Sequence, residues 1–160
     1  MILKRRSMFI LLLTLFLLFL AAARVFMVSV DPKVKMKKEA LTLMAPTVEF
    51  SNVTKFYLFN TDKTYYTIQG VDKDGKEIYA ITPSDGGDVT ILQQSAVVNE
   101  QEARSITLQD KPDVEVLEAR LGLLNGEPVW EINYRMGNNR IGYYYISAQN
   151  GKWVKDIENI

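Results

Sequence analysis

The first strong pattern in the sequence is an apolar run near the N-terminus, from Met8 to Ala23, in which Thr14 is the only polar residue. A helix rises about 1.5 Å per residue, so this run would cover about 24 Å, slightly less than the roughly 30 Å apolar core of a bilayer. Apolar residues resume after Arg24 and continue to Val30. A helix over Met8–Val30 would be long enough to cross a membrane, with the Arg24 guanidinium extending to the headgroups.

A cleaved secretory signal is the alternative interpretation of this segment. Lys4, Arg5 and Arg6 would be its basic start, and the alanines that end the apolar run fit a cleavage site. The renewed apolar character after Arg24 favours a retained anchor. We therefore predict that residues 1–30 are a cytoplasmic tip and a single transmembrane helix, which contacts membrane lipid. Either interpretation places the rest of the chain outside the cytoplasm, although basic residues on both sides of the apolar run do not by themselves fix this orientation.

A helix is predicted directly after the anchor. Asp31 fits an N-cap and Pro32 the first helical position, and Pro46 disfavours helical geometry at Ala45, so the segment should end at Met44. The helix begins with four membrane-proximal basic residues: Lys33, Lys35, Lys37 and Lys38. These lysines could bind lipid headgroups or an anionic wall polymer, or they could simply form the solvated face of the helix.

Alternating apolar and polar positions then predict a first set of four antiparallel strands, separated by polar turns. The expected strands are Thr47–Phe59, Thr64–Val71, Lys76–Thr82 and Asp88–Gln93.

The same plan recurs in the second half of the chain. Asn99 and Glu102 form a capping-box pattern that predicts a short helix to about Gln109. Asn-Gly pairs at Asn125-Gly126 and Asn150-Gly151 predict type I′ hairpins. The expected strands are Val114–Leu124, Glu127–Arg135, Arg140–Ser147 and Lys152–Ile157.

A constant shift of 64 positions superposes the two halves, for example Tyr79 on Tyr143 and Gly87 on Gly151. This period predicts a duplicated unit. We expect an α+β protein with a first unit at residues 31–95 and a second at 96–160, each with one helix packed on an antiparallel sheet of about four strands.

Composition limits the chemistry that these units could perform. The chain has no Cys and no His, which removes disulfides, thiol nucleophiles, imidazole bases and the usual zinc ligands. All 19 acidic residues follow Val30, against 15 of the 19 basic ones, so this part has a net charge of −4. That balance does not favour nucleic acid as a partner.

The sequence also contains few motifs typical of catalytic or ligand-binding sites. No serine is followed by lysine three positions later, and there is no Gly-rich phosphate loop. Asp72-x-Asp74-Gly75 fits a hairpin turn better than a calcium loop. We therefore predict no catalytic residue, no cofactor and no metal site, and an enzyme is the weak hypothesis.

Aromatic residues near the C-terminus are the candidate contact residues. Alternation places Trp130 in the core and sends Tyr144 to the opposite face from Tyr143 and Tyr145, so some aromatic surface must be covered by the other unit or by a partner. Our partner-binding candidates are Tyr143, Tyr144, Tyr145 and Trp153. If Tyr144 contacts a partner, Tyr144→Ala should weaken capture and leave thermal unfolding nearly unchanged, whereas a large drop in melting temperature would show that it is structural.

Short aromatic and glycine-containing segments resemble known domains. In the second half they are Pro128-Val-Trp-Glu-Ile-Asn-Tyr134, Gly142-Tyr-Tyr-Tyr-Ile146 and Asn150-Gly-Lys-Trp153, which are similar to a PepSY-type domain. In the first half they are Phe56-Tyr57, Tyr65-Tyr66-Thr-Ile68 and Gly70-x-Asp72-x-Asp74-Gly75-Lys76, which look like the companion domain of the TseB/YpmB family of Gram-positive bacteria. The segment Glu100–Pro112 departs from the family because its helix is short and has few lysines.

This resemblance implies a cystatin-like fold in each unit and a membrane-anchored protein that faces the cell wall. It also implies regulation of cell-wall elongation, without catalysis, through contact with a penicillin-binding protein or another cell-envelope protein. The association of PepSY domains with peptidases leaves a second function open, that of an inhibitor or folding aid for an extracellular protease. A sensor of wall polymer or lipid, acting through the membrane-proximal lysines, is a third.

Overall fold

The protein is described here from a computed structural model that covers residues 2–137 and 139–158, with the backbone alone described for helical residues 2–10 and 26–31. The chain forms two compact units, residues 1–38 and residues 39–160. All four strands of each sheet lie in the second unit.

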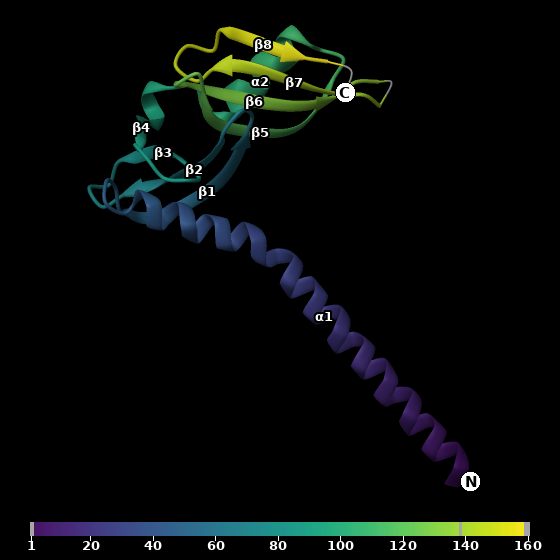
Figure 1. Cartoon of the computed structure of the whole chain (residues 1–160). Helices are drawn as coiled ribbons and strands as arrows, with labels where there is room; N and C mark the ends of the chain where they lie inside the picture. The colour runs from purple at the N-terminus through teal and green to yellow at the C-terminus, as the bar shows by residue number, and fades with distance from the viewer. Residues whose placement is uncertain (1, 138, 159–160) are drawn as a thin grey trace. The chain divides into compact units, whose positions relative to one another are not determined.

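One helix, α1 (Ile2–Met44), runs through the whole N-terminal region, including Pro32 (Figure 1). The prediction that a helix begins at Asp31 and Pro32 is therefore wrong. An interior proline removes one backbone hydrogen bond and crowds the carbonyl four residues earlier, but its φ angle fits the helix, so the hydrogen bonds on either side can carry the helix through it. The Asp31 side chain lies outside the described residues.

In the described part of the chain, no helix is long and apolar enough to qualify as a membrane span. The predicted span Met8–Val30 includes residues 8–10 and 26–30, whose side chains are outside that part, as are those of Lys4, Arg5 and Arg6.

The first sheet is an antiparallel meander that follows the end of α1. Its strands pair in chain order: β1 (Phe50–Asn60), β2 (Thr64–Asp72), β3 (Glu77–Pro83) and β4 (Thr90–Gln93). Ala40 and Met44, on the last turns of α1, are fully buried in the same unit. β1 begins later than predicted because the chain first turns at the helix end, where Thr47 N and Val48 N both donate to Met44 O at 2.9 Å.

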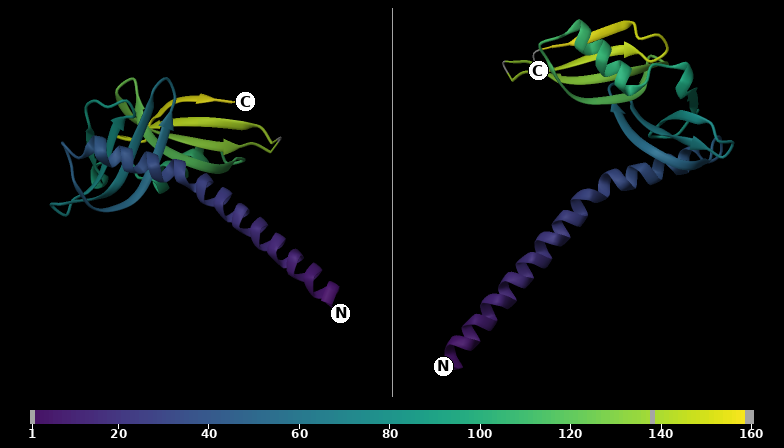
Figure 2. Two further views of the ribbon diagram at one scale, coloured as in Figure 1. Left: turned by 60° about the horizontal axis from the view of Figure 1, so that its bottom comes forward. Right: turned by 180° about the vertical axis from the view of Figure 1, so that it is seen from behind.

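The second sheet repeats this order after a short 3-10 turn, η1 (Gln94–Ala96), and the helix α2 (Glu100–Asp110). Its strands are β5 (Glu115–Leu124), β6 (Glu127–Arg135), β7 (Ile141–Ser147) and β8 (Trp153–Ile157). α2 covers one face of this sheet, which is clearest from behind (Figure 2). The α+β class, with two four-stranded antiparallel sheets each packed with a helix, is as predicted.

Local signals account for much of this agreement. The capping box is present: Glu102 N donates to Asn99 Oδ1 at 3.0 Å, and Asn99 N donates to Glu102 Oε2 at 2.8 Å. Asn125 (φ 52°) and Gly126 (φ 83°) have the positive φ angles of a type I′ turn.

The predicted type I′ turn at Asn150-Gly151 is wrong. Gly151 has a positive φ of 71°, but Asn150 is not among the described residues with positive φ. Gly151 N donates to Ser147 O at 2.9 Å and Lys152 N to Asn150 Oδ1 at 3.0 Å, which together form a wider loop before β8.

The element order is consistent with the duplication predicted from the 64-residue shift. Moved by 64 positions, the bounds of β3 (Glu77–Pro83) become those of β7 (Ile141–Ser147). The unit boundaries 31–95 and 96–160 stay predictions, because both sheets belong to one compact unit.

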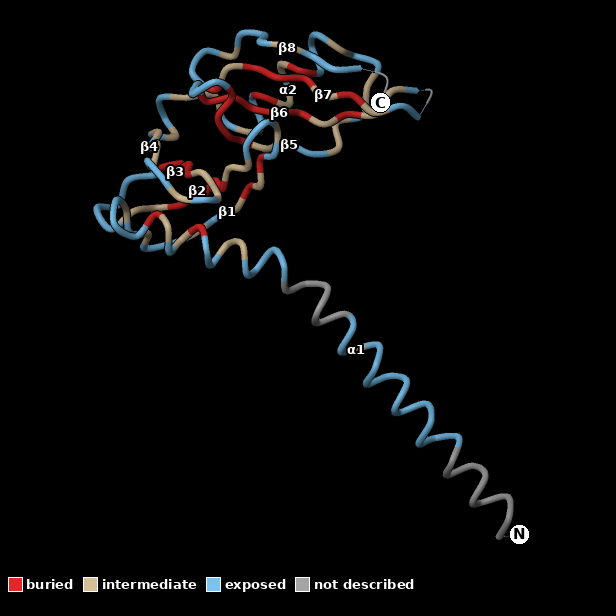
Figure 3. Tube along the Cα trace, viewed as in Figure 1, coloured by how far each residue is buried: buried red, intermediate tan, exposed pale blue. Residues whose placement is uncertain are grey.

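The two sheets share a core, drawn in red in Figure 3. Trp130 of β6 is fully buried, as predicted, and its Nε1 donates to Val98 O at 2.7 Å. The rings of Tyr57 and Tyr79, from the first sheet, meet it edge-on at centroid distances of 5.4 and 5.9 Å. Thr67 adds a buried hydrogen bond to Leu121 O at 2.6 Å. Residues 39–160 therefore form one body rather than two independent modules.

Candidate functional site

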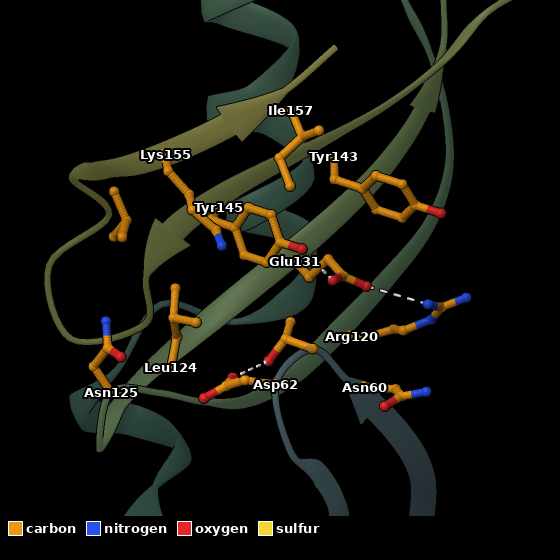
Figure 4. Close-up of a pocket in the computed structure, with 12 residues that line it drawn as sticks. Asn60, Asp62, Arg120, Leu124, Asn125, Glu131, Tyr143, Tyr145, Lys155 and Ile157 are labelled. Atoms are coloured by element: carbon orange, nitrogen blue, oxygen red, sulfur yellow. Dashed lines mark hydrogen bonds and ion pairs between the residues drawn. The ribbon is translucent and has the colours of Figure 1, made fainter. Parts of the chain in front are cut away.

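A pocket of about 720 Å³ lies on the face of the second sheet that points away from α2; we call this face the open face. Side chains on β6 alternate, so Trp130 and Ile132 face α2 while Glu131 faces the pocket. Figure 4 shows the pocket between β8 and the tip of the β1–β2 hairpin. Its lining residues are Asn60, Thr61, Asp62, Arg120, Leu124, Asn125, Glu131, Tyr143, Tyr145, Val154, Lys155 and Ile157.

The floor of the pocket holds a buried ionic network. Glu131 is only 2% exposed, accepts a hydrogen bond from Tyr145 Oη at 2.6 Å, and lies 3.2 Å from Arg120 Nη1. Arg120 Nη2 also pairs with Glu118 at 2.6 Å. Burial, followed by the hydrogen bond to Glu131, raises the pKa of Tyr145 above its ordinary value. Tyr145 is thus held neutral as a donor, and both oxygens of Glu131 already have partners.

The rim of the pocket carries charges from opposite sides. Lys155 of β8 lies with its Nζ 4.7 Å from the centroid of the Tyr145 ring, in cation–π contact. Asp62, at the hairpin tip, accepts a hydrogen bond from Thr61 Oγ1 at 2.8 Å. That hydrogen bond is the main reason why the pKa of Asp62 lies below its ordinary value, and the charge of Lys155 contributes in the same direction.

The first sheet closes one end of the open face. Phe59 of β1 is fully buried in a cluster with Leu124, Val129 and Tyr145. The contact needs a glycine opposite, because a Cβ at Gly122 would lie 2.2 Å from Phe59 Cγ. Aromatic surface on the second sheet is therefore covered, in part, by the first sheet.

The structure separates the four aromatic residues that the sequence suggested as partner contacts. Tyr144 is 4% exposed on the α2 side, where its hydroxyl donates to Asp110 Oδ2 at 2.5 Å, and Tyr145 is 3% exposed on the open face. Packing within the protein already buries both side chains, which leaves little of either for a partner, and their partner contact stays a prediction. Tyr143 is half-buried in the pocket wall, and Trp153 is 60% exposed outside the pocket.

Of the membrane-proximal lysines, Lys33, Lys35 and Lys38 are exposed and Lys37 is half-buried within the first compact unit. Nothing in their surroundings identifies a ligand, so their lipid or polymer contact stays a prediction.

Sequence reasoning missed Asp62, Arg120, Glu131 and Lys155 as members of one pocket. Alternation along β6 does place Glu131 on the other face of the sheet from Trp130. Only the three-dimensional structure shows that Glu131 is buried there and that the β1–β2 hairpin lines the same pocket. Among the described residues, no group of three or more acidic side chains is arranged to hold a metal ion.

Comparison with known proteins gives these features a family context. Residues 39–83 match the family described as cell wall elongation regulator TseB-like domain, and residues 97–156 match PepSY, the peptidase propeptide and YPEB domain. The chain carries a TseB-like domain followed by a PepSY domain. The pocket thus lies on the open face of the PepSY sheet, with the hairpin of the TseB-like domain as one wall.

A solved structure supports the fold of this pair of domains. The YpmB protein from Bacillus subtilis matches with a TM-score of 0.66 at 22% identity, over 76% of this chain and 95% of that one. At this identity the likeness concerns the fold alone. No curated protein sequence matches the chain significantly.

Proposed function

We propose that this protein is a membrane-anchored, extracytoplasmic regulator of cell-wall elongation that acts without catalysis, by contact with a penicillin-binding protein. The observation that carries the proposal is the TseB-like match at residues 39–83, a domain described as a cell wall elongation regulator.

Membrane anchoring is part of the proposal. In the described part of α1, the large apolar side chains from Leu11 to Leu20 are exposed to between 48% and 69%. Contiguous exposed apolar surface of this kind is rare on a soluble body and typical of a membrane or protein contact. Together with the apolar run in the sequence, it supports a single-pass anchor. The cell-wall description of the TseB-like match supports placing residues 39–160 outside the cytoplasm.

The contact surface that we propose is centred on β8, an edge strand of the PepSY sheet. Trp153, Val154 and Ile157 are 60%, 38% and 39% exposed, although all three are apolar. Exposed tryptophan is a frequent anchor of protein interfaces. Trp153 therefore remains our leading contact residue, and Tyr143, which is half-buried in the pocket wall and pairs with Ile157 at the other end of β8, is secondary.

Photo-crosslinking in native membranes tests this proposal. A photoreactive amino acid at position 153 of the full-length protein should give a crosslinked product that fluorescent penicillin also labels. The same probe at Lys76, an exposed position in the β2–β3 turn, is the matched control and should give no such product. Absence of a penicillin-labelled product at position 153, or equal labelling from position 76, would contradict the proposed contact.

A second candidate function follows from the PepSY match, whose description refers to peptidase propeptides. The alternative is an inhibitor or folding aid of an extracellular protease. Adding the full-length protein to the proteases secreted by its host should slow substrate cleavage if this alternative holds, and unchanged cleavage rates would count against it.

A further inference from the structure

The pocket on the open face of the PepSY sheet has features that a flat protein contact would not require. It is recessed, with a volume of about 720 Å³, within the range of roughly 300 to 1,000 Å³ that small-molecule sites occupy. Its floor is held by hydrogen bonds, because Arg120 and Tyr145 each donate to one oxygen of the buried Glu131.

We propose that this pocket binds a short peptide with free termini, with the peptide carboxylate at Lys155 and its ammonium group at Asp62. The inference rests on the geometry of the pocket and does not depend on the proposed regulation of elongation.

The charge distribution identifies the ends of the ligand. Four charged residues line the pocket, and two of them, Arg120 and Glu131, are paired with each other. Within the described part of the chain, neither Lys155 nor Asp62 forms an ion pair. They line the pocket from opposite sides, Lys155 from β8 and Asp62 from the hairpin tip (Figure 4). A ligand with one positive and one negative end could form an ion pair with each of these two residues, whereas a singly charged ligand could form only one.

The remaining lining matches the body of a peptide. Leu124, Val154 and Ile157 provide apolar surface for a side chain. Asn60 and Asn125 provide amide groups that can both donate to and accept from peptide bonds. Lys155 is positioned in advance by its contact with the Tyr145 ring, which limits the entropy lost when it binds a carboxylate.

An internal segment of a partner protein would fit less well. Such a segment carries neither a terminal ammonium nor a terminal carboxylate, so it could satisfy Lys155 and Asp62 only through charged side chains. Capping the two ends of a peptide therefore distinguishes the two kinds of ligand.

The test is a titration of the full-length protein, solubilised in mild detergent and labelled with ¹⁵N, with the tripeptide Ala-Leu-Ala. With both termini free, the tripeptide should shift the amide signals of pocket residues such as Lys155 and Asp62. N-acetylation or C-amidation should each weaken binding by about fivefold, the upper range for one exposed ion pair. No shift in the pocket up to about 10 mM peptide, or equal binding of the capped and free forms, would overturn the proposal.

Substitutions separate the two ends of the ligand. Lys155→Met should weaken binding of the free tripeptide by about fivefold and leave binding of the C-amidated form unaffected. Asp62→Asn should weaken binding of the free tripeptide by about fivefold and leave binding of the N-acetylated form unaffected. Lys76→Met and Asp74→Asn, at exposed positions of the β2–β3 turn, are the matched controls and should bind like the wild type. Equal weakening in pocket and control variants would overturn the site. Unchanged signals of Trp130 and Tyr134 confirm that each variant is folded.

Discussion

At the scale of single residues, the junction between the two domains depends on a glycine. Gly122 on β5 faces Phe59 on β1 so closely that any β-carbon would overlap the phenyl ring. Neither residue could be recognised from the sequence, where Gly122 is simply a glycine inside a predicted strand. Its role arises only because the two sheets meet there.

Gly122→Ala should therefore destabilise the protein. The added Cβ must displace Phe59, and overpacking of this kind costs about 1–3 kcal/mol of unfolding free energy. Gly137→Ala is the control, because a Cβ there meets nothing within 4 Å, and chemical denaturation of both variants measures the difference. Equal stability of the two variants would show that Phe59 is not held tightly against β5.

A second junction surrounds Glu100, at the first turn of α2. Tyr57 Oη donates to its Oε2 at 2.9 Å, Arg104 Nε donates to its Oε1 at 3.0 Å, and Lys55 also pairs with it. Burial alone would raise the pKa of Glu100, but these hydrogen bonds outweigh it and hold the pKa below the ordinary value of 4.5.

This lowered pKa gives a prediction for acid stability. The unfolded chain takes up a proton at Glu100 more readily than the folded protein, so the stability that Glu100 provides is present above pH 4.5 and is lost as the pH falls through the folded pKa. Glu100→Gln should lower the unfolding free energy at pH 7, and its difference from the wild type should shrink as the pH falls below 4.5. Glu77→Gln, at an exposed position, is the control. A difference that does not change with pH would contradict an ionised Glu100 at the junction.

At the scale of elements, the strand periodicities carried most of the information. Both meanders, the capping box at Asn99 and the type I′ turn at Asn125 follow from local rules, which do not depend on distant contacts. The continuous helix through Pro32 and the wider loop at Asn150 do not follow from local rules. Each depends on the conformation of the backbone on either side of it. β-alternation correctly placed Tyr143 and Tyr145 on the face opposite Tyr144, but it could not reveal which packing partners bury them.

Burial of Tyr144 reverses the stability expectation drawn from the sequence. Tyr144→Ala should lower the unfolding free energy by about 3–5 kcal/mol, as for other large buried aromatic side chains. Tyr144→Phe keeps the ring, loses the hydrogen bond to Asp110, and should cost about 1 kcal/mol. Trp153→Ala, at an exposed position, should stay within about 0.5 kcal/mol of the wild type. Thermal unfolding of the three variants gives the order, and an unchanged melting temperature for Tyr144→Ala would contradict its place in the core.

At the scale of the whole molecule, the TseB-like and PepSY domains act as a single body. Tyr57 and Tyr79 of the first sheet pack on Trp130 of the second, and the β1–β2 hairpin closes one end of the open face. The sequence predicted two similar units but could not show that they share a core, since no local pattern encodes which faces meet. The pocket, built from both domains, was out of reach of sequence reasoning for the same reason.

A single body in place of two independent modules changes how a partner could be regulated. A contact at β8 and a ligand in the pocket would both involve the same strand, because Val154, Lys155 and Ile157 line the pocket, while Trp153 is exposed and not among the lining residues. A ligand in the pocket would then alter the affinity of the β8 edge for its partner only if the ligand binds the partner-free protein and the protein–partner complex with different affinities.

The most direct test of the central claim measures wall growth in cells. Incorporation of a fluorescent D-amino acid into the side wall should change when the gene is deleted, and should return to normal with the wild-type chain. Trp153→Ala should accumulate normally in the membrane but fail to restore the rate. Side-wall incorporation that is unaffected by deletion would contradict a role in elongation, and full restoration by Trp153→Ala would contradict contact through β8.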